Sequence, residues 1–168
     1  IATGRSKTAR GQGEQTMLDR VELSVTGDVL TISLRPSAFQ TDDDPDQSSP
    51  VKLILTTPAL SGIELAGAGS IVARGMAQAH AQITAAGSGL VQVGDLAVDR
   101  LDVAQIGSGS VRLAGKANEL TARLSGAGAL DASGLDVRDL DVTLQGAASV
   151  QASASRTAKI NAIGSGSV

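Results

Sequence analysis

Six short stretches of this sequence share one pattern: GAGSI at residues 67–71, GSGLV at 87–91, GSGSV at 107–111, GAGAL at 126–130, GAASV at 146–150 and GSGSV at 164–168. Their first residues are 20, 20, 19, 20 and 18 positions apart. A fixed period of about 20 residues is typical of proteins that stack one short structural unit on the next. The pattern therefore predicts a repeat architecture.

Alternating apolar residues flank each stretch. Leu140, Val142 and Leu144 lie six, four and two residues before Gly146, and Val150 lies four residues after it. Alternation with a period of two places such residues on one face of a β-strand. Some repeats carry a weaker third apolar pair: Leu96 with Val98, and Leu135 with Val137. Each repeat therefore predicts two strands joined at a corner, followed by a shorter third side.

Glycine suits the predicted corners, because it adopts positive φ at little cost. One strand pair cannot bury its apolar edge alone, whereas stacked turns bury it between them. We therefore predict an all-β fold, a right-handed single-stranded parallel β-helix with about 20 residues per turn. Its structural corner residues are Gly67, Gly69, Gly87, Gly89, Gly107, Gly109, Gly126, Gly128, Gly146, Gly164 and Gly166. Ala148 replaces the second glycine of the fifth corner, so either this position needs no positive φ or that turn is distorted.

Outward positions one turn apart carry charges of opposite sign, which favours this register. The predicted neighbours are Arg100 with Glu119, Arg112 with Asp131, and Asp141 with Lys159. Each exposed pair contributes only about 0–1 kcal/mol, so the pairs support the stack without driving it. Glu119 beside Asp139 is a like-charge step and counts against the same register.

The first 59 residues lack the repeat. Alternating stretches at 21–25 and 29–34, joined at residues 26–28, predict a β-hairpin, and residues 51–55 predict a further strand. We expect residues 1–59 to cap a six-turn helix formed by residues 60–168, because an open sheet edge invites pairing with another chain. The intervening loop is acidic and contains Asp42, Asp43, Asp44 and Asp46.

Composition narrows the function. The net charge is −3, and acidic and basic residues are mixed along the chain. This pattern does not indicate the basic surface that binds nucleic acids. The absence of cysteine excludes disulfides and thiolate metal sites. No apolar run is long enough for a transmembrane helix. The chain starts at Ile1 and stops at Val168, just after a corner, so we expect both ends to be boundaries within a longer protein.

The order of these parts resembles a bacterial family called the putative auto-transporter adhesin head, or GIN, domain. The resemblance is carried by VTGDVLTI at 25–32, TPAL at 57–60 and repeats that close with LSGAG or IGSG, and it covers residues 14–168. It implies a β-helix in an exported protein of the bacterial periplasm or cell surface. It implies no catalytic residues.

Two features could suggest a metal or proton-transfer site. His80 is the only histidine, and without a nearby carboxylate cluster or cysteine we expect an exposed side chain with no such role. The acidic run at residues 42–46 offers the hard oxygens that Ca²⁺ prefers, but it lacks the glycine and distal glutamate of an EF-hand loop. A solvated loop is the favoured interpretation, and cation binding there stays open.

An enzymatic alternative rests on Asp102 and Asp141, which share an outward row two turns apart. Their separation of about 9.6 Å is near that of the paired carboxylates in inverting glycosidases. Thr121 lies between them and Lys159 beyond. However, the chain has no Trp or Tyr for a long carbohydrate groove. Gln105 occupies an inward position, so its amide must find partners within the stack.

We therefore predict a non-enzymatic envelope or surface module for binding, adhesion or scaffolding, with no cofactor and no metal site. Its partner would be a protein or a glycan that the sequence does not identify, and self-association into a homo-oligomer is a further expectation. The alternative is a polysaccharide-active β-helix enzyme that uses carboxylates on neighbouring turns.

Overall fold

The computed structural model describes residues 1–3, 8–13, 15–26, 29–34 and 52–168. The chain divides into two compact units, each described by itself. One contains Thr8–Leu55, and the other contains Ile1–Lys7 with Thr56–Val168.

The smaller unit contains a β-hairpin. Its elements are β2 (Thr8–Gln12), the single-turn helix α1 (Gln15–Leu18), β3 (Val21–Thr26), β4 (Val29–Leu34) and the first part of β5 (Lys52–Thr57). β3 and β4 are antiparallel, with Val21 opposite Leu34 and Thr26 opposite Val29. This register confirms the predicted hairpin, whose turn residues 27–28 lie outside the described residues. The capping role of this region stays a prediction.

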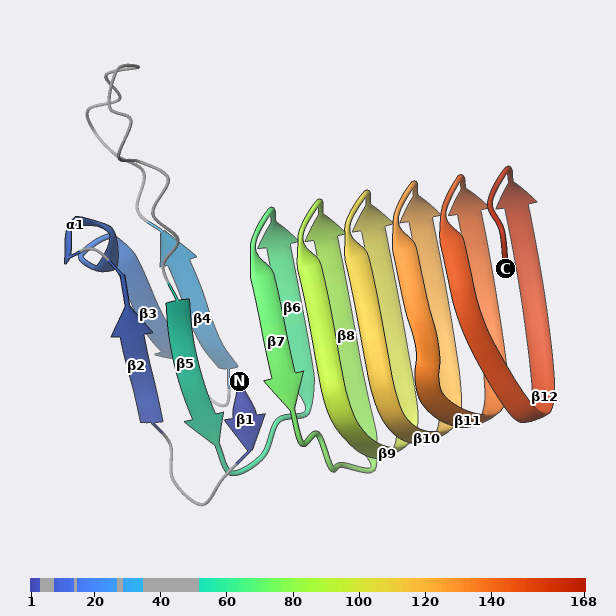
Figure 1. Ribbon diagram of the computed structural model, residues 1–168, viewed down its shortest axis with the longest axis horizontal. Coiled ribbons are helices and arrows are strands. Elements are labelled where there is room, and N and C mark those ends of the chain that lie inside the picture. Colours follow the sequence, from blue (N-terminus) through green and yellow to red (C-terminus); the bar gives the residue numbers. More distant parts are fainter. Residues whose placement is uncertain (4–7, 14, 27–28, 35–51) are drawn as a thin grey trace. The chain divides into compact units, whose positions relative to one another are not determined.

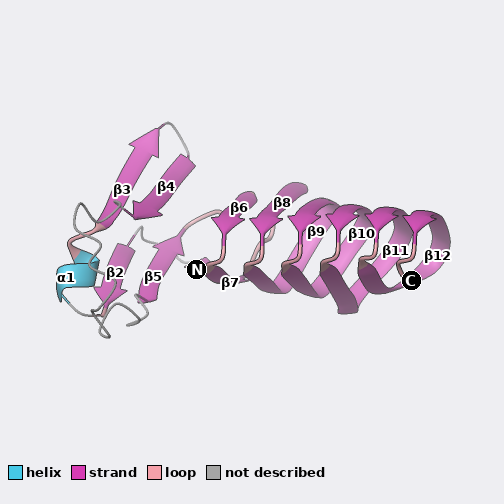
Figure 2. Ribbon diagram, turned by 90° about the horizontal axis from the view of Figure 1, so that it is seen from above, coloured by secondary structure: helices cyan, strands magenta, loops and turns pink. Residues whose placement is uncertain are grey.

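The larger unit is a parallel β-helix, as the sequence predicts. Its strands are β1 (Ala2–Thr3), β6 (Gly62–Gly67), β7 (Ser70–Arg74), β8 (His80–Gly87), β9 (Leu90–Gly107), β10 (Ser110–Gly126), β11 (Ala129–Gly146) and β12 (Ser149–Gly164). As the chain advances from β6 to β12, the nearer strands in Figure 1 run down and the more distant ones run up, which makes the helix right-handed. Figure 2 shows the successive turns from above.

Residues that pair across adjacent turns are one repeat apart in the sequence. Val111 pairs with Val91 on one side and with Leu130 on the other, all in parallel strands. Positions that the repeat aligns in sequence are thus neighbours in space. Over the described residues, the six corners bound five complete turns, with β6 before the first and an isolated bridge from Ser167 to Ser149 after the last.

From β9 onward a single strand runs from one corner to the next, where the sequence predicts separate strands. Within such a strand, the chain bends between the second and third sides of the turn. Between β9 and β10, this bend interrupts the ladder only locally, with a register shift between Leu113 and Gly115. At this bend Gly115 has φ +132°, and Asp95 has φ 56° in the left-handed region. Between β9 and β10 the pairing resumes within two residues of β10, so the second and third sides remain one bent strand. Between β11 and β12 the interruption is longer and runs from Ala132 to Val137.

The core consists of rows of like residues stacked along the helix axis. Leu101, Leu120 and Leu140 are register neighbours with exposed fractions of 0%, 0% and 4%. The weaker apolar pairs of the third side, Leu96 with Val98 and Leu135 with Val137, are also buried. The interior is narrow, which explains why small aliphatic residues fill it without aromatic rings.

The two glycines of a corner serve different purposes. The first has positive φ in every corner; Gly107, for example, has φ +109°. The second has ordinary φ, but after the first corner it has little room. A Cβ on Gly109, for example, would lie 2.6 Å from the Gly89 carbonyl oxygen. Ala148, at the second position of its corner, has no positive φ and is buried. That position therefore does not require left-handed backbone, which decides between the two explanations the sequence leaves open.

Strand β1 extends the ladder beyond β7. Ala2 pairs with Arg74 of β7 and with Thr56 of β5. The backbone N–H of Arg74 donates to the Ile1 carbonyl at 2.9 Å, and the amino terminus donates to the Val72 carbonyl. Ala2 and Thr3 thus form a short strand at this edge of the helix.

Candidate functional site

Two outward rows of side chains run along the helix on the strand segments that precede the corners. We call them the charged rows. The first contains His80, Arg100, Glu119, Asp139 and Thr157, and the second contains Gln82, Asp102, Thr121, Asp141 and Lys159. The rows exist because successive turns align the same repeat position and because alternate residues of a strand face outward.

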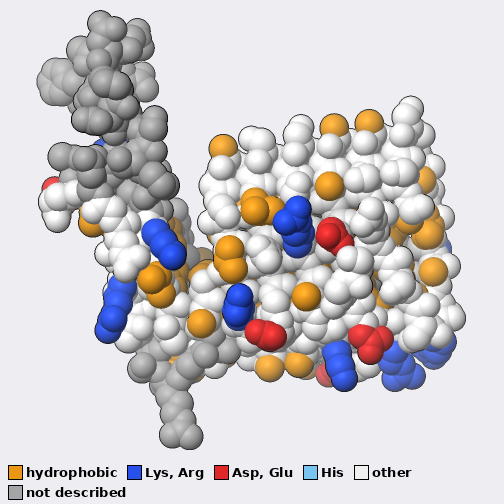
Figure 3. All heavy atoms as spheres, viewed as in Figure 1, with side chains coloured by type: hydrophobic (Ala, Val, Ile, Leu, Met, Phe, Trp, Pro, Cys, Tyr) orange, Lys and Arg blue, Asp and Glu red, His pale blue; other side chains and the backbone are white. Residues whose placement is uncertain are grey.

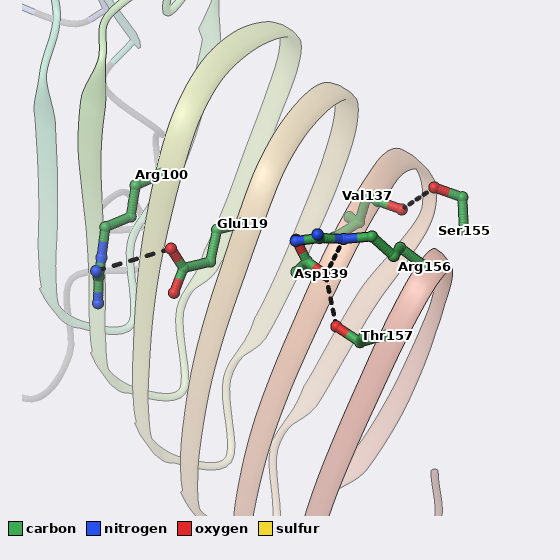
Figure 4. A network of polar contacts seen from close by, with 7 residues as sticks. All are labelled: Arg100, Glu119, Val137, Asp139, Ser155, Arg156 and Thr157. Atoms are coloured by element: carbon green, nitrogen blue, oxygen red, sulfur yellow. Dashed lines mark hydrogen bonds and ion pairs between the residues drawn. The ribbon is translucent and has the colours of Figure 1, made fainter.

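Arg100 connects the two rows on the strand segments that lead to the third and fourth corners. Its Nε lies 3.4 Å from Oδ2 of Asp102, and its Nη1 lies 3.8 Å from Oε2 of Glu119, the pair drawn in Figure 4. The aligned Arg100 and Glu119 therefore form the ion pair that the sequence predicts. The three side chains are partly exposed, so water weakens their attraction.

His80 is exposed, as expected from the sequence, but it has one carboxylate neighbour that the sequence pattern does not predict. Its Nε2 lies 3.2 Å from Oδ2 of Asp102, although 57% of the His80 side chain is exposed. Asp102 belongs to the other row and sits diagonally from His80, one turn along. A rule that compares only residues within one row misses such a diagonal contact.

Asp139 is held by the last turn. Arg156 donates from Nε to Oδ1 at 2.9 Å and from a second nitrogen to Oδ2, while Thr157 Oγ1 donates to Oδ1 at 2.5 Å (Figure 4). These hydrogen bonds, that of Arg156 first, lower the pKa of Asp139, and Asp139 raises the pKa of Arg156. Arg156 thus offsets the repulsion between the neighbouring carboxylates of Glu119 and Asp139. The row pattern does not predict this contact, because Arg156 belongs to neither charged row.

The second charged row bears on the enzymatic alternative. Thr121 is the register neighbour of both Asp102 and Asp141 and is only 7% exposed. Lys159 Nζ lies 3.7 Å from Oδ2 of Asp141. Each carboxylate of the proposed pair thus has a basic neighbour, and the position between them is occupied by a buried threonine.

Arg112 and Asp131 are aligned as predicted, but Asp131 has a closer partner. Ser133 donates to Asp131 Oδ1 from its backbone N–H at 3.1 Å and from its hydroxyl at 2.6 Å. These two hydrogen bonds lower the pKa of Asp131, and the charge of Arg112 contributes less. Arg112 therefore aligns with Asp131 without serving as its main partner.

Gln105 points into the stack, as its position predicts. It is 2% exposed, and its Nε2 donates to the Gly109 carbonyl of the next corner. Its Oε1 has no hydrogen-bond partner among the described residues. The amide nitrogen of Gln105 is therefore hydrogen-bonded within the core, whereas its amide oxygen is not.

A shallow groove of about 600 Å³ lies beside the first charged row, on the third side of the helix. Four neighbouring turns line it. Ala77, Gln78 and Ala79 come from the first of these turns, and Ala97, Val98 and Asp99 come from the next. The remaining lining residues are Lys116, Ala117, Asn118, Asp136 and Arg138. The groove is apolar where the alanines gather and charged toward β11.

Charged side chains are unevenly spread over the helix. In the face shown in Figure 3 they are sparse in the middle and gather along the lower border, where the strands bend toward the third side. The sequence alone does not reveal this groove, because the apolar pattern of the third side is weak. Two pairs of polar residues one repeat apart point to it: Lys116 with Asp136, and Asp99 with Asn118.

No metal site emerges from the part of the chain that the structure describes, where no group of three or more His, Asp or Glu side chains is arranged to hold an ion. The acidic residues Asp42, Asp43, Asp44 and Asp46 lie outside the described residues. None of the described helices has the length and apolar character needed to cross a membrane.

The fold and its outward rows define a class: parallel β-helix domains that present periodic side chains on an open surface. The whole chain, residues 1–168, matches the family described as putative auto-transporter adhesin, head GIN domain, and it belongs to that family. This confirms the resemblance noted in the sequence. The family name indicates a bacterial surface or envelope protein.

Two solved structures resemble this chain in fold. One is a putative adhesin from Bacteroides fragilis, with a TM-score of 0.79 and 19% sequence identity, covering 99% of this chain and 84% of that one. The other is a putative lipid binding protein from Parabacteroides distasonis, with a TM-score of 0.52 and 13% identity, covering 99% of this chain and 87% of that one. A search among curated proteins found no match.

Proposed function

We propose that this chain is a non-enzymatic binding module of the bacterial envelope, which uses the outer surface of its β-helix for adhesion or scaffolding. The observation that carries the proposal is the match of the whole chain to the adhesin head family. The similar fold of a protein described as an adhesin supports it. A position in the periplasm or on the cell surface is part of the proposal.

The polar contacts of the charged rows also support a binding role over catalysis. A glycosidase of the inverting type needs an acid and a base that flank a space for sugar and water. Asp102 contacts His80 and Arg100, Asp141 contacts Lys159, and the buried Thr121 lies between them. Thr121 thus occupies the position between the two carboxylates that an inverting mechanism would need for the sugar and the attacking water.

An array of glycans, envelope polymers and envelope proteins tests the proposal if the purified chain is scored for both retention and product release. We expect binding without depolymerisation, with and without Ca²⁺. Release of shortened or unsaturated products would contradict the proposal. An activity that disappears in Asp102→Ala or Asp141→Ala would then assign the enzyme role to those carboxylates.

Self-association is a separate part of the proposal, and sedimentation at several concentrations tests it. We expect a concentration-dependent homo-oligomer. A monomer throughout the range would contradict this part and leave the binding role unaffected.

A further inference from the structure

We infer that the end of the helix formed by β12 is a self-association surface, on which a second copy of this chain docks through a two-fold axis. The inference rests on the self-association part of the proposed function and gives it a surface and a geometry. In this dimer the two β12 strands pair antiparallel, and the two apolar cores meet end to end.

The apolar core is uncovered at this end. Ile160 continues the core row of Val142, its register neighbour, yet Ile160 is 50% exposed and Val142 is 0% exposed. Ala158 and Ala162 continue the rows of the buried Leu140 and Leu144 and are likewise exposed. Rows that each inner turn covers with the next turn therefore end here in an open apolar surface.

The backbone of β12 is unpaired along the same edge. Among the described strands, β12 is the last in its sheet and pairs only with β11, apart from the isolated bridge between Ser149 and Ser167. Such an edge presents N–H and C=O groups that can pair with another strand. The end thus combines free backbone groups with exposed apolar side chains, and a partner must satisfy both.

A second copy meets these two requirements better than other partners. A lipid surface would cover the apolar side chains but leave the backbone groups without hydrogen bonds. An extended peptide added as one strand would pair with one straight segment of the turn and leave the rest of the core open. A second copy presents the same edge, the same core rows and the same outline.

A two-fold axis at Ile160 gives a register without charge conflict. Directly opposite residues of antiparallel strands lie on the same face of the sheet. With the two Ile160 residues opposite each other, Ala158 of one copy lies opposite Ala162 of the other, and Lys159 lies opposite Asn161. An axis at Lys159 would instead place two like charges directly opposite, which is destabilising.

The charges of β12 are already neutralised by β11. Arg156 donates to Asp139, and Lys159 Nζ lies 3.7 Å from Oδ2 of Asp141. β12 contains no other charged residue. Because the preceding turn holds both cations, two identical surfaces can approach without strong mutual repulsion.

The other end of the ladder disfavours a head-to-tail filament. There Ala2 of β1 already pairs with Arg74 of β7 and with Thr56 of β5. A β12 edge from a second copy would have to displace this short strand in order to continue the helix. A contact between two β12 ends needs no displacement and closes after two copies.

The size of the surface predicts a weak dimer. A turn of about 20 residues has a perimeter of about 66 Å, and a sheet with its side chains is about 10 Å thick. Each copy therefore buries roughly 600 Å², and both together about 1,200 Å², which is the lower limit for specific interfaces. We expect a dissociation constant in the micromolar range.

Sedimentation equilibrium of the purified chain, from below to above micromolar concentration, tests the surface. Ile160→Lys places a charge at the two-fold axis. The matched control is Ile106→Lys, because Ile106 is also exposed and lies on the outer face of an inner turn. Melting temperatures of dilute samples first establish that both variants are folded.

We expect the wild type to dimerise, Ile160→Lys to dimerise at least about tenfold more weakly, and Ile106→Lys to match the wild type. A wild type that stays monomeric would overturn the inference and leave this end to another partner. Dimerisation of Ile160→Lys at wild-type strength would overturn the surface. Oligomers that grow beyond the dimer would overturn the two-fold geometry.

A cross-link tests the register. The chain has no cysteine of its own, so chains with Lys159→Cys and chains with Asn161→Cys can be mixed and oxidised. We expect disulfides mainly between unlike chains, because only opposite residues bring their Cα atoms within about 4.4–6.8 Å. Disulfides mainly between like chains would overturn the register.

These failures are distinguishable from failure of the proposed binding function. A chain that is retained on the array but stays monomeric remains a binding module without this self-association. A chain that releases products contradicts the module itself, whatever its oligomeric state.

Discussion

At the scale of single residues, the buried amide of Gln105 is the clearest local conflict in the core. It occupies a row in which its register neighbours are Ala85 and Leu124. Its Nε2 bonds to the Gly109 carbonyl, but its Oε1 has no partner among the described residues. A buried polar atom without a partner costs about 1–3 kcal/mol.

We predict that Gln105→Met stabilises the protein by about 1 kcal/mol, because methionine has a similar length and no polar atoms. The Gly109 carbonyl keeps the hydrogen bond from Ala129 N–H at 3.0 Å, so the substitution leaves no new orphan group. Chemical denaturation measures the change. Gln92→Met, the same replacement at an exposed position, should stay within about 0.5 kcal/mol of the wild type. A destabilised Gln105→Met would show that the amide has a partner after all.

The corner glycines separate two physical requirements. Gly67 has φ +98°, and a methyl group added there would meet open space, because nothing lies within 4 Å of its Cβ position. Gly107 has φ +109°, and its Cβ position lies 2.6 Å from the Gly87 carbonyl oxygen. Left-handed backbone is thus common to both positions, whereas close contact with the preceding turn occurs only at Gly107.

We predict that Gly67→Ala lowers the free energy of unfolding by about 1–2 kcal/mol, the cost of left-handed backbone alone. Gly107→Ala should cost distinctly more, because a carbonyl oxygen must also move. Thermal and denaturant unfolding of both variants measure the difference. Equal losses would mean that the stack relaxes freely around the added methyl group.

At the scale of the strands, Asp139 of β11 accepts hydrogen bonds from Arg156 and Thr157 of β12. Its pKa lies below the ordinary value of 3.8, chiefly through the Arg156 hydrogen bonds and then through that of Thr157. A carboxylate with a lowered pKa in the folded state stabilises the fold above its unfolded pKa and loses that contribution as the pH falls through the folded value. The effect therefore belongs to acidic solution, below about pH 4.

We predict that the melting temperature of the wild type exceeds that of Asp139→Asn at neutral pH, and that the two converge as the pH is lowered below 3.8. Melting curves between neutral pH and strongly acidic pH measure this convergence. Asp136→Asn is the matched control, because Asp136 makes neither an ion pair nor a hydrogen bond among the described residues. A constant difference between wild type and Asp139→Asn would contradict the role of this hydrogen-bonded carboxylate.

Some contacts between the strands are predictable from the sequence, and others are not. Period and alternation suffice to align Arg100 with Glu119 and Asp141 with Lys159, because aligned positions become neighbours in the ladder. The diagonal contact from His80 to Asp102 depends on how side chains lean, which row alignment does not encode. The continuous strands from corner to corner escape prediction for a similar reason, since a local bend need not interrupt the ladder.

The candidate site is harder to predict than the fold. Corner glycines and core rows recur in every repeat, so the pattern reinforces itself along the chain. The groove depends on Lys116, Asn118 and Arg138, which differ from turn to turn and lie on the side with the weakest alternation. A repeat pattern identifies what is common to the turns, whereas a binding site depends on what distinguishes them.

At the scale of the whole molecule, the turns stack with one repeat between neighbours. The charged rows, the core rows and the four-turn groove all follow from that register. The chain contains no cysteine, so introduced pairs of cysteines report on the register without interference. Disulfides form when the Cα atoms are about 4.4–6.8 Å apart, which matches neighbouring strands and excludes strands two turns apart.

The most direct test is therefore disulfide formation in Gln92→Cys/Arg112→Cys, whose positions are register neighbours. Two control pairs keep Gln92→Cys and place the second cysteine at Ala114, two residues out of register, or at Asp131, one turn further along. Mild oxidation followed by peptide mass spectrometry gives the yield of each intramolecular bond. We predict rapid, near-complete bonding only in the Gln92/Arg112 pair. Preferential bonding in either control pair would contradict the stacking of the turns and everything derived from it.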